Sequence, residues 1–126
     1  MANELKIGMS LSFSKGSVGT QKSENFSVDV TGEAYAAGTV TLANATALDI
    51  SATTATVTNV GYVYLKCVSA DTGSTIMTFG PLATCLAGSL KQGEACLLRW
   101  PASEANLFVK SSAAEGLLLE YCFVEE

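Results

Sequence analysis

The sequence predicts an all-β fold, an antiparallel β-sandwich of jelly-roll type formed by a single domain over residues 1–126. Three observations predict it. Apolar and polar residues alternate along several short segments, β-branched residues are frequent within them, and Gly-containing turn signals separate them. No segment has the apolar spacing of an amphipathic helix longer than a turn or two. The length is typical of one domain with one hydrophobic core.

The amino-terminal segment shows the clearest alternation. In ELKIGMSLSF, every second residue from Leu5 to Phe13 is apolar, which predicts a half-buried strand. The residues that follow, 14–21, are rich in Gly and Ser and predict a loop or a long hairpin connection. ENFSVDV then alternates again and predicts a second strand with Phe26 pointing inward.

The middle and the end of the chain contain further strand candidates. GTVTL and ALDIS are short, whereas NVGYVYLKCVSA and STIMTFG are expected to form a hairpin across Asp71–Gly73. A turn at Lys91–Glu94 leads into ACLLRW, which Pro101 ends because proline cannot donate to a β-ladder. We expect ANLFVKSS and GLLLEYCFVEE to pair as the last two strands.

The carboxyl-terminal segment is apolar on both faces when it is divided with a period of two. One face carries Leu117, Leu119, Tyr121 and Phe123. The other carries Leu118, Cys122 and Val124, interrupted only by Glu120. A strand of this kind is covered on both faces. We therefore expect one face to close the core and the other to meet another subunit.

Charge is scarce in this chain, at 15% of residues against about 25% in an average soluble domain. The net charge is −5, and the seven basic residues are scattered singly. This pattern disfavours binding to a nucleic-acid backbone or to an anionic membrane surface. A surface with so little charge either exposes many hydroxyl and methyl groups or is partly covered by neighbouring subunits.

The four cysteines, at positions 67, 85, 96 and 122, form no C-x-x-C pair, and the chain has no His. Structural zinc is therefore disfavoured. The segment MANELKIGMS has no basic stretch followed by a long apolar run, so we expect no secretory signal there and a reducing compartment. In that setting the cysteines are expected to be buried free thiols.

No motif in the sequence marks a catalytic, metal or cofactor site. GSVGT at 16–20 has the order Lys-Gly-Ser rather than that of a phosphate-binding loop, and favours a flexible hairpin loop. No pair of carboxylates is marked for glycosidase chemistry, and Ser or Cys nucleophiles lack a His base. The sequence thus predicts a protein that is not an enzyme and that takes no cofactor.

A subunit or partner interface is the kind of site that the composition favours. Its predicted members are aromatic residues and the second face of the last segment, because large rings with one polar tip fit interfaces well. They are Tyr62, Tyr64, Trp100, Leu118, Glu120, Cys122 and Val124.

The second half of the chain resembles small β-sandwich structural proteins of tailed bacteriophages. In those proteins a strand of the form Gly-aromatic-x-aromatic-Leu-Lys leads into a hairpin. A Leu-x-x-Gly-Glu turn then precedes a strand ending near Arg, and a Leu-Glu-Tyr strand closes the chain with an acidic tail. These elements fall on Gly61 to Lys66, on Leu90, Gly93, Glu94 and Arg99, and on Leu119, Glu120 and Tyr121. The resemblance covers roughly residues 57–126.

This resemblance implies a virion component, a capsid decoration or cement protein or a head–tail accessory. Its partners would be the major capsid protein or other virion proteins, and it would form a homo-oligomer, with a trimer favoured. It would be assembled in the cytoplasm of the host bacterium and end in the virion. The alternative that the residues leave open is a carbohydrate- or receptor-binding β-sandwich module of a phage fibre, spike or tail accessory.

Overall fold

The computed structural model describes residues 5–30, 32, 34–42, 48–49, 60–69, 75–82, 84–85, 87–100, 106–112 and 116–125. The chain divides into two compact units, Met1–Thr31 and Gly32–Glu126. In the described residues every regular element is a β-strand.

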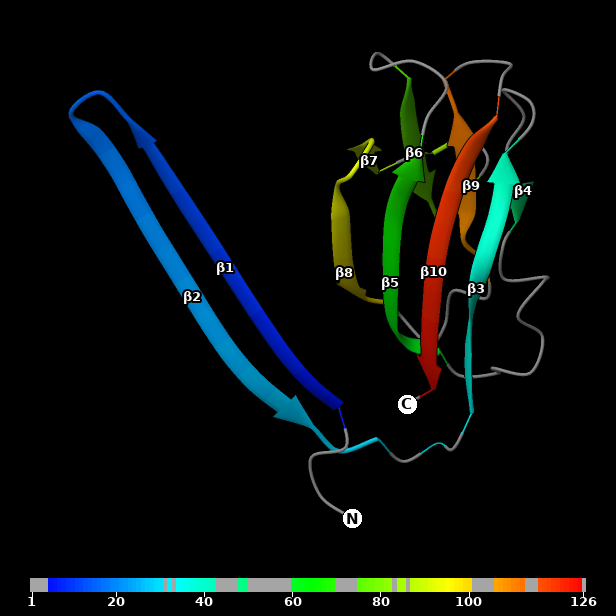
Figure 1. Cartoon of the computed structure of the whole chain (residues 1–126). Helices are drawn as coiled ribbons and strands as arrows, with labels where there is room; N and C mark the ends of the chain where they lie inside the picture. The colour runs from blue at the N-terminus through cyan, green and yellow to red at the C-terminus, as the bar shows by residue number, and fades with distance from the viewer. Residues whose placement is uncertain are drawn as a thin grey trace. The chain divides into compact units, whose positions relative to one another are not determined.

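The first unit contains one long antiparallel hairpin. Strands β1 (Leu5–Lys15) and β2 (Val18–Val28) pair along their full length, from Leu5 opposite Val28 to Lys15 opposite Val18 (Figure 1). The turn consists of two residues, and the first of them, Gly16, has φ of +61°, a left-handed conformation that favours glycine. The expectation of a loop over 14–21 is therefore wrong. Ser and Gly in this stretch extend the ladder because its hydrogen bonds come from the backbone.

The described residues of the second unit form eight strands in two four-stranded sheets. Their bounds are β3 (Tyr35–Leu42), β4 (Leu48–Asp49), β5 (Val60–Ser69), β6 (Ile76–Gly80), β7 (Gly88–Lys91), β8 (Ala95–Arg99), β9 (Phe108–Ser111) and β10 (Leu117–Glu125). One sheet has the order β3-β10-β5-β8 and the other β4-β9-β6-β7. All pairings are antiparallel, and the two sheets form two layers (Figure 1).

The strand pairing is nested from the outside of the sequence inward. The first strand of this unit, β3, pairs with the last, β10, and β4 pairs with β9. In the same way β5 pairs with β8, and β6 with β7. This nesting, divided over two sheets, is the arrangement of a jelly roll. The prediction of an antiparallel β-sandwich of jelly-roll type is confirmed.

Two of the expected hairpins are wrong. Strands β5 and β6 lie in different sheets, so the chain crosses between layers after β5 instead of turning back within one sheet. The expected turn residues Asp71–Gly73 themselves lie outside the described residues. Strands β9 and β10 also belong to different sheets. A turn signal shows where the chain reverses, but a reversal within one sheet and a crossing to the facing sheet require similar turn residues.

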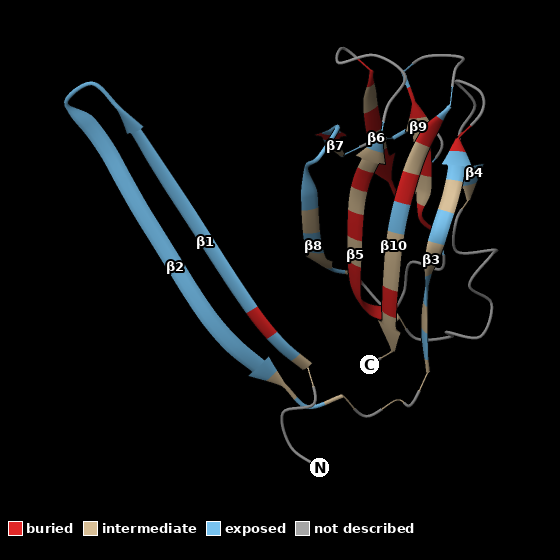
Figure 2. Ribbon diagram, in the orientation of Figure 1, coloured by how far each residue is buried: buried red, intermediate tan, exposed pale blue. Residues whose placement is uncertain are grey.

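The hydrophobic core lies between the two layers. The register places Leu119 opposite Cys67 and Phe123 opposite Val63, so that buried side chains of β10 and β5 lie side by side. The facing sheet supplies Met77, Phe79 and Val109, and other residues complete the cluster: Leu42, Leu65, Leu90, Leu107 and Leu117. Figure 2 shows the resulting alternation of buried and partly exposed residues along β5 and β10. The predicted inward face of the last segment is confirmed.

The turn between β7 and β8 is hydrogen-bonded to Cys67, near the end of β5. Gly93 has φ of +84°, and its N–H donates to the carbonyl of Cys67 at 2.7 Å. The N–H of Cys67 donates in return to the carbonyl of Glu94 at 3.0 Å. The Glu94 carboxylate also accepts a hydrogen bond from the N–H of Lys91 at 2.6 Å, which closes the turn. The predicted turn at 91–94 is confirmed.

The hairpin unit differs from the sequence expectation in burial. Its apolar residues alternate as predicted, and Ile7 is buried, but Met9, Leu11, Phe13 and Phe26 are exposed (Figure 2). The expectation of a half-buried strand is therefore wrong for most of β1. Alternation shows which face is apolar but not what covers that face. The prediction of one domain over 1–126 stays a prediction for the first 31 residues, since the sandwich is built from Gly32–Glu126.

No helix in the part of the chain that the structure describes is long and apolar enough to cross a membrane.

The two faces of β10 provide a test of the packing. Leu119→Ala is expected to lower the free energy of unfolding by about 2–5 kcal/mol, because it leaves a cavity in the core. Leu118→Ala, one residue away on the other face, is expected to cost clearly less, since Leu118 is only partly buried. Urea denaturation of both variants measures the difference. Equal losses would contradict the assignment of the two faces.

Candidate functional site

The sheet formed by β3, β10, β5 and β8 has a second face, turned away from the core. We call this the outer face. Its members are set by the register: Tyr35, Ala37, Thr39 and Thr41 on β3; Leu118, Glu120, Cys122 and Val124 on β10; Tyr62, Tyr64 and Lys66 on β5; and Ala95, Leu97 and Arg99 on β8. The face carries three charged side chains among apolar, aromatic and hydroxyl residues. Such a surface suits contact with another protein.

Tyr62 is held in place by its neighbour across the strand pair, Arg99. One Arg99 Nη1–H donates to the Tyr62 Oη at 3.2 Å, and the guanidinium carbon lies 5.3 Å from the centroid of the ring. Tyr62 is only 8% exposed, with Val124 opposite it on the other side. The hydrogen bond and the cation–π contact restrain Tyr62 at the β8 side of the outer face.

Opposite charges lie across the middle of the outer face. Glu120 on β10 is the register partner of Lys66 on β5, and Thr39 lies opposite Glu120 on the other side. Opposite charges directly across a strand pair stabilise a sheet modestly. Glu120 is exposed and Lys66 is partly buried, so the carboxylate is available to a partner at the centre of an otherwise weakly charged surface.

The structure brings together six of the seven predicted interface residues. Tyr62, Tyr64, Leu118, Glu120, Cys122 and Val124 all lie on the outer face, on the adjacent strands β5 and β10. Trp100 is separated from them, because it packs against the core cluster. Its backbone N–H donates to the carbonyl of Gly61 at 2.8 Å, which extends the β5–β8 ladder by one residue. The seventh predicted residue thus contributes to the sandwich interior.

All four cysteines are free, as expected. Only Cys67 is buried, whereas Cys96 and Cys122 are partly buried and Cys85 is exposed, so the expectation that all are buried is wrong. Burial raises the pKa of the Cys67 thiol, and the negative charge of Glu94 raises it further. Burial also raises the pKa of Cys96 and of Cys122. These three thiols are therefore protonated near neutral pH, which makes them poor nucleophiles.

Within the described ranges, no group of three or more His, Cys, Asp or Glu side chains is placed to hold a metal ion. What the outer face offers chemically is a sheet surface with one restrained tyrosine, Tyr62, and a central carboxylate, Glu120.

One surface was not identified as a site from the sequence. The apolar residues of the hairpin unit, from Met9 to Phe26, were expected to be in the core but are exposed. The alternation of apolar and polar residues in the first segment already indicated that the hairpin has one apolar face. The sequence does not show that these strands pair only with each other in the described residues.

Comparisons of the chain with protein-family models, with curated proteins and with solved structures found no match.

The accessibility of the thiols leads to a test of this part of the fold. A thiol reagent added to the native protein is expected to modify Cys85 first, because Cys85 is the exposed cysteine. Cys67 is expected to react only at the rate at which β5 opens. Mass spectrometry of labelled peptides over time measures the order, and Cys85→Ser should remove the fast phase. Early labelling of Cys67 would contradict the position of β5 in the core.

Proposed function

We propose that this chain is a structural protein of a tailed-bacteriophage virion, a capsid decoration or cement protein that binds and stabilises the assembled shell. Its partner is the major capsid protein, and it acts as a homo-oligomer, a trimer by the resemblance. It catalyses no reaction. It is assembled in the cytoplasm of the host bacterium and is incorporated into the virion. A protein of this kind stabilises a shell through the free energy of binding at subunit junctions.

The main support for the proposal is that the segments that resemble the phage proteins lie next to each other in the sandwich and include part of the outer face. Those elements are distant in the sequence, yet they fall on β5, on the β7–β8 turn and on β10, which are adjacent in the sandwich. The turn is joined to β5 through Cys67. The residues that resemble the phage proteins thus form one continuous structural unit. The same unit carries Tyr64, Glu120 and Cys122 on its outer face.

The fold class agrees with this role without establishing it. Jelly rolls occur in viral capsid domains and in lectins, among other proteins. The alternative, a carbohydrate- or receptor-binding module of a fibre, spike or tail accessory, has less support from the side chains. Trp100 packs against the core, and Arg99 lies over the ring of Tyr62. Neither ring is therefore open on both sides for stacking on a sugar.

The virion role is tested on purified phage particles whose genome encodes this chain. Quantitative mass spectrometry is expected to find the chain in the particle at a copy number comparable to that of the major capsid protein. A copy number of a few per particle would favour a neck or tail accessory instead. Absence of the chain from the particles would overturn the proposal.

The role of Glu120 is tested with shells that lack the chain. Glu120→Ala is expected to weaken binding to these shells by about tenfold, roughly 1.4 kcal/mol, because it removes the central carboxylate of the outer face. Its melting temperature should change little, since Glu120 is exposed. Lys110→Ala, on β9 of the other sheet, is the matched control and should bind as the wild type does. Equal binding by Glu120→Ala and the control would remove the outer face from the proposed interface.

A further inference from the structure

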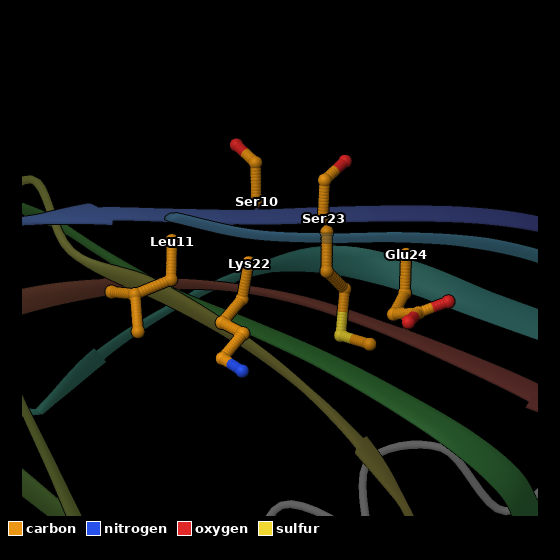
Figure 3. Close-up of a pocket in the computed structure, with 6 residues that line it drawn as sticks. Ser10, Leu11, Lys22, Ser23 and Glu24 are labelled. Carbon is orange, nitrogen blue, oxygen red and sulfur yellow. The ribbon is translucent and has the colours of Figure 1, made fainter. Parts of the chain in front are cut away.

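The hairpin β1–β2 has two chemically different faces. Its register alternates between the two faces, and one face is made of six cross-strand pairs. These pairs are Leu5–Val28, Ile7–Phe26, Met9–Glu24, Leu11–Lys22, Phe13–Thr20 and Lys15–Val18. We call this the ribbon face. The opposite face carries mostly Ser, Gly, Asn and Gln. Figure 3 shows Leu11, Lys22 and Glu24 on one side of the ribbon, and Ser10 and Ser23 on the other.

The ribbon face is apolar and exposed. The exposed fractions of its large apolar side chains are 50% for Met9, 60% for Leu11, 49% for Phe13, 65% for Val18 and 41% for Phe26. A two-stranded hairpin alone is at best marginally stable in water, and it becomes stable when an apolar face is packed against something else. Five large apolar side chains on one ribbon therefore indicate that this face is covered in the working protein.

The charges on the ribbon face indicate that a second copy of the same face can cover it. Lys22 and Glu24 are next to each other on the face, about 7 Å apart along β2, and they have opposite signs. Their pairs, with Leu11 and Met9, are the third and fourth of the six, so the charges lie at the middle of the ribbon. A two-fold axis across the ribbon between these pairs places Lys22 of one copy opposite Glu24 of the other. The same axis places Glu24 opposite the second Lys22.

The same two-fold axis also aligns the rest of the face. Three pairs lie on each side of it, so two ribbons stacked face to face overlap along their whole length. Phe13 then lies over Ile7 of the second copy, Leu11 over Met9, and Val18 over Val28. Only the outermost Leu5 meets a charged side chain, Lys15, whose long aliphatic stem can cover it. An interface that uses the same patch on both copies is the form that two-fold symmetric dimers take.

We propose that the ribbon face binds the ribbon face of a second copy of this chain around that two-fold axis. The proposal does not depend on the virion role, and it uses a different surface from the outer face. The area sets the expected strength. A strand of 11 residues is about 37 Å long, and two strands are about 10 Å wide. Two such faces have roughly 740 Å² of flat area together, which is small beside the ~2,000 Å² and more that obligate interfaces bury. The association is therefore reversible and depends on concentration.

The charge pattern permits a test by exchange of charges on the full-length chain. Sedimentation velocity over a wide range of protein concentrations measures the association of the wild type. Lys22→Glu and Glu24→Lys are each expected to weaken association by at least tenfold, because each places like charges opposite each other at the axis. The double variant Lys22→Glu/Glu24→Lys is expected to associate as the wild type does. An equimolar mixture of the two single variants is also expected to associate, since each supplies the charges that the other lacks.

Controls on the two faces separate this interface from any other. Leu11→Glu should abolish the association through the ribbon face, whereas Ser10→Glu, its neighbour on the opposite face, should leave that association unchanged. A wild type that does not self-associate through the whole range would overturn the proposal and leave the ribbon face to a different partner. Association that all the charge variants share would overturn it as well, because it would then arise from another surface. The double variant and the mixture decide the matter even if Leu11→Glu fails to fold.

Discussion

The structure depends on one constraint, that the apolar face of a β-sheet must be covered. In Gly32–Glu126 the constraint is met inside the chain, because the two four-stranded sheets cover each other. In the described part of the hairpin unit, two strands provide a long apolar face without a second layer of their own. Burial of one large apolar side chain contributes about 1.5–3 kcal/mol of favourable free energy. Covering the five exposed ones therefore strongly favours association. The chain thus combines a self-sufficient sandwich with a hairpin whose apolar face requires a partner.

Strand β10 is the element through which the sandwich is closed. It lies between β3 and β5, so the end of the chain is hydrogen-bonded on both sides. At its last residues the N–H of Glu125 donates to the carbonyl of Ala34, and the N–H of Ala34 donates to the Glu125 carboxylate, both at 3.0 Å. The apolar residues on both faces of β10 are explained by this position, because one face packs in the core and the other belongs to the outer face. The position also places Glu120 and Cys122 at the centre of the outer face.

The sequence predicted the parts of the structure that depend on side-chain alternation. A period of two separates the two faces of residues 117–124. It also separates Val63 and Leu65 from Tyr62 and Tyr64 on β5. For this reason six of the seven interface candidates lie on one face. What depends on long-range pairing was not predicted. The sequence signals after β5 and β9 are those of hairpins, yet in each case the next strand belongs to the other sheet. Trp100 was misplaced for a different reason, because its neighbour Arg99 lies on the outer face and Trp100 therefore lies on the core side. The exposure of Met9 and Leu11 was missed because alternation does not identify the covering layer.

The difference between the self-sufficient sandwich and the hairpin that requires a partner is measured most directly by hydrogen exchange. The exchange of the backbone amides is followed as a function of protein concentration. If the hairpin depends on a second copy, the amides of β1 and β2 become more protected as the concentration rises, whereas those of β5 and β10 stay equally protected throughout. The reason is that the sandwich core lies within one chain, whereas we propose that the ribbon face is covered by a second copy. Strong protection of the β1 and β2 amides at concentrations where the ribbon faces are not associated would contradict this dependence on a second copy.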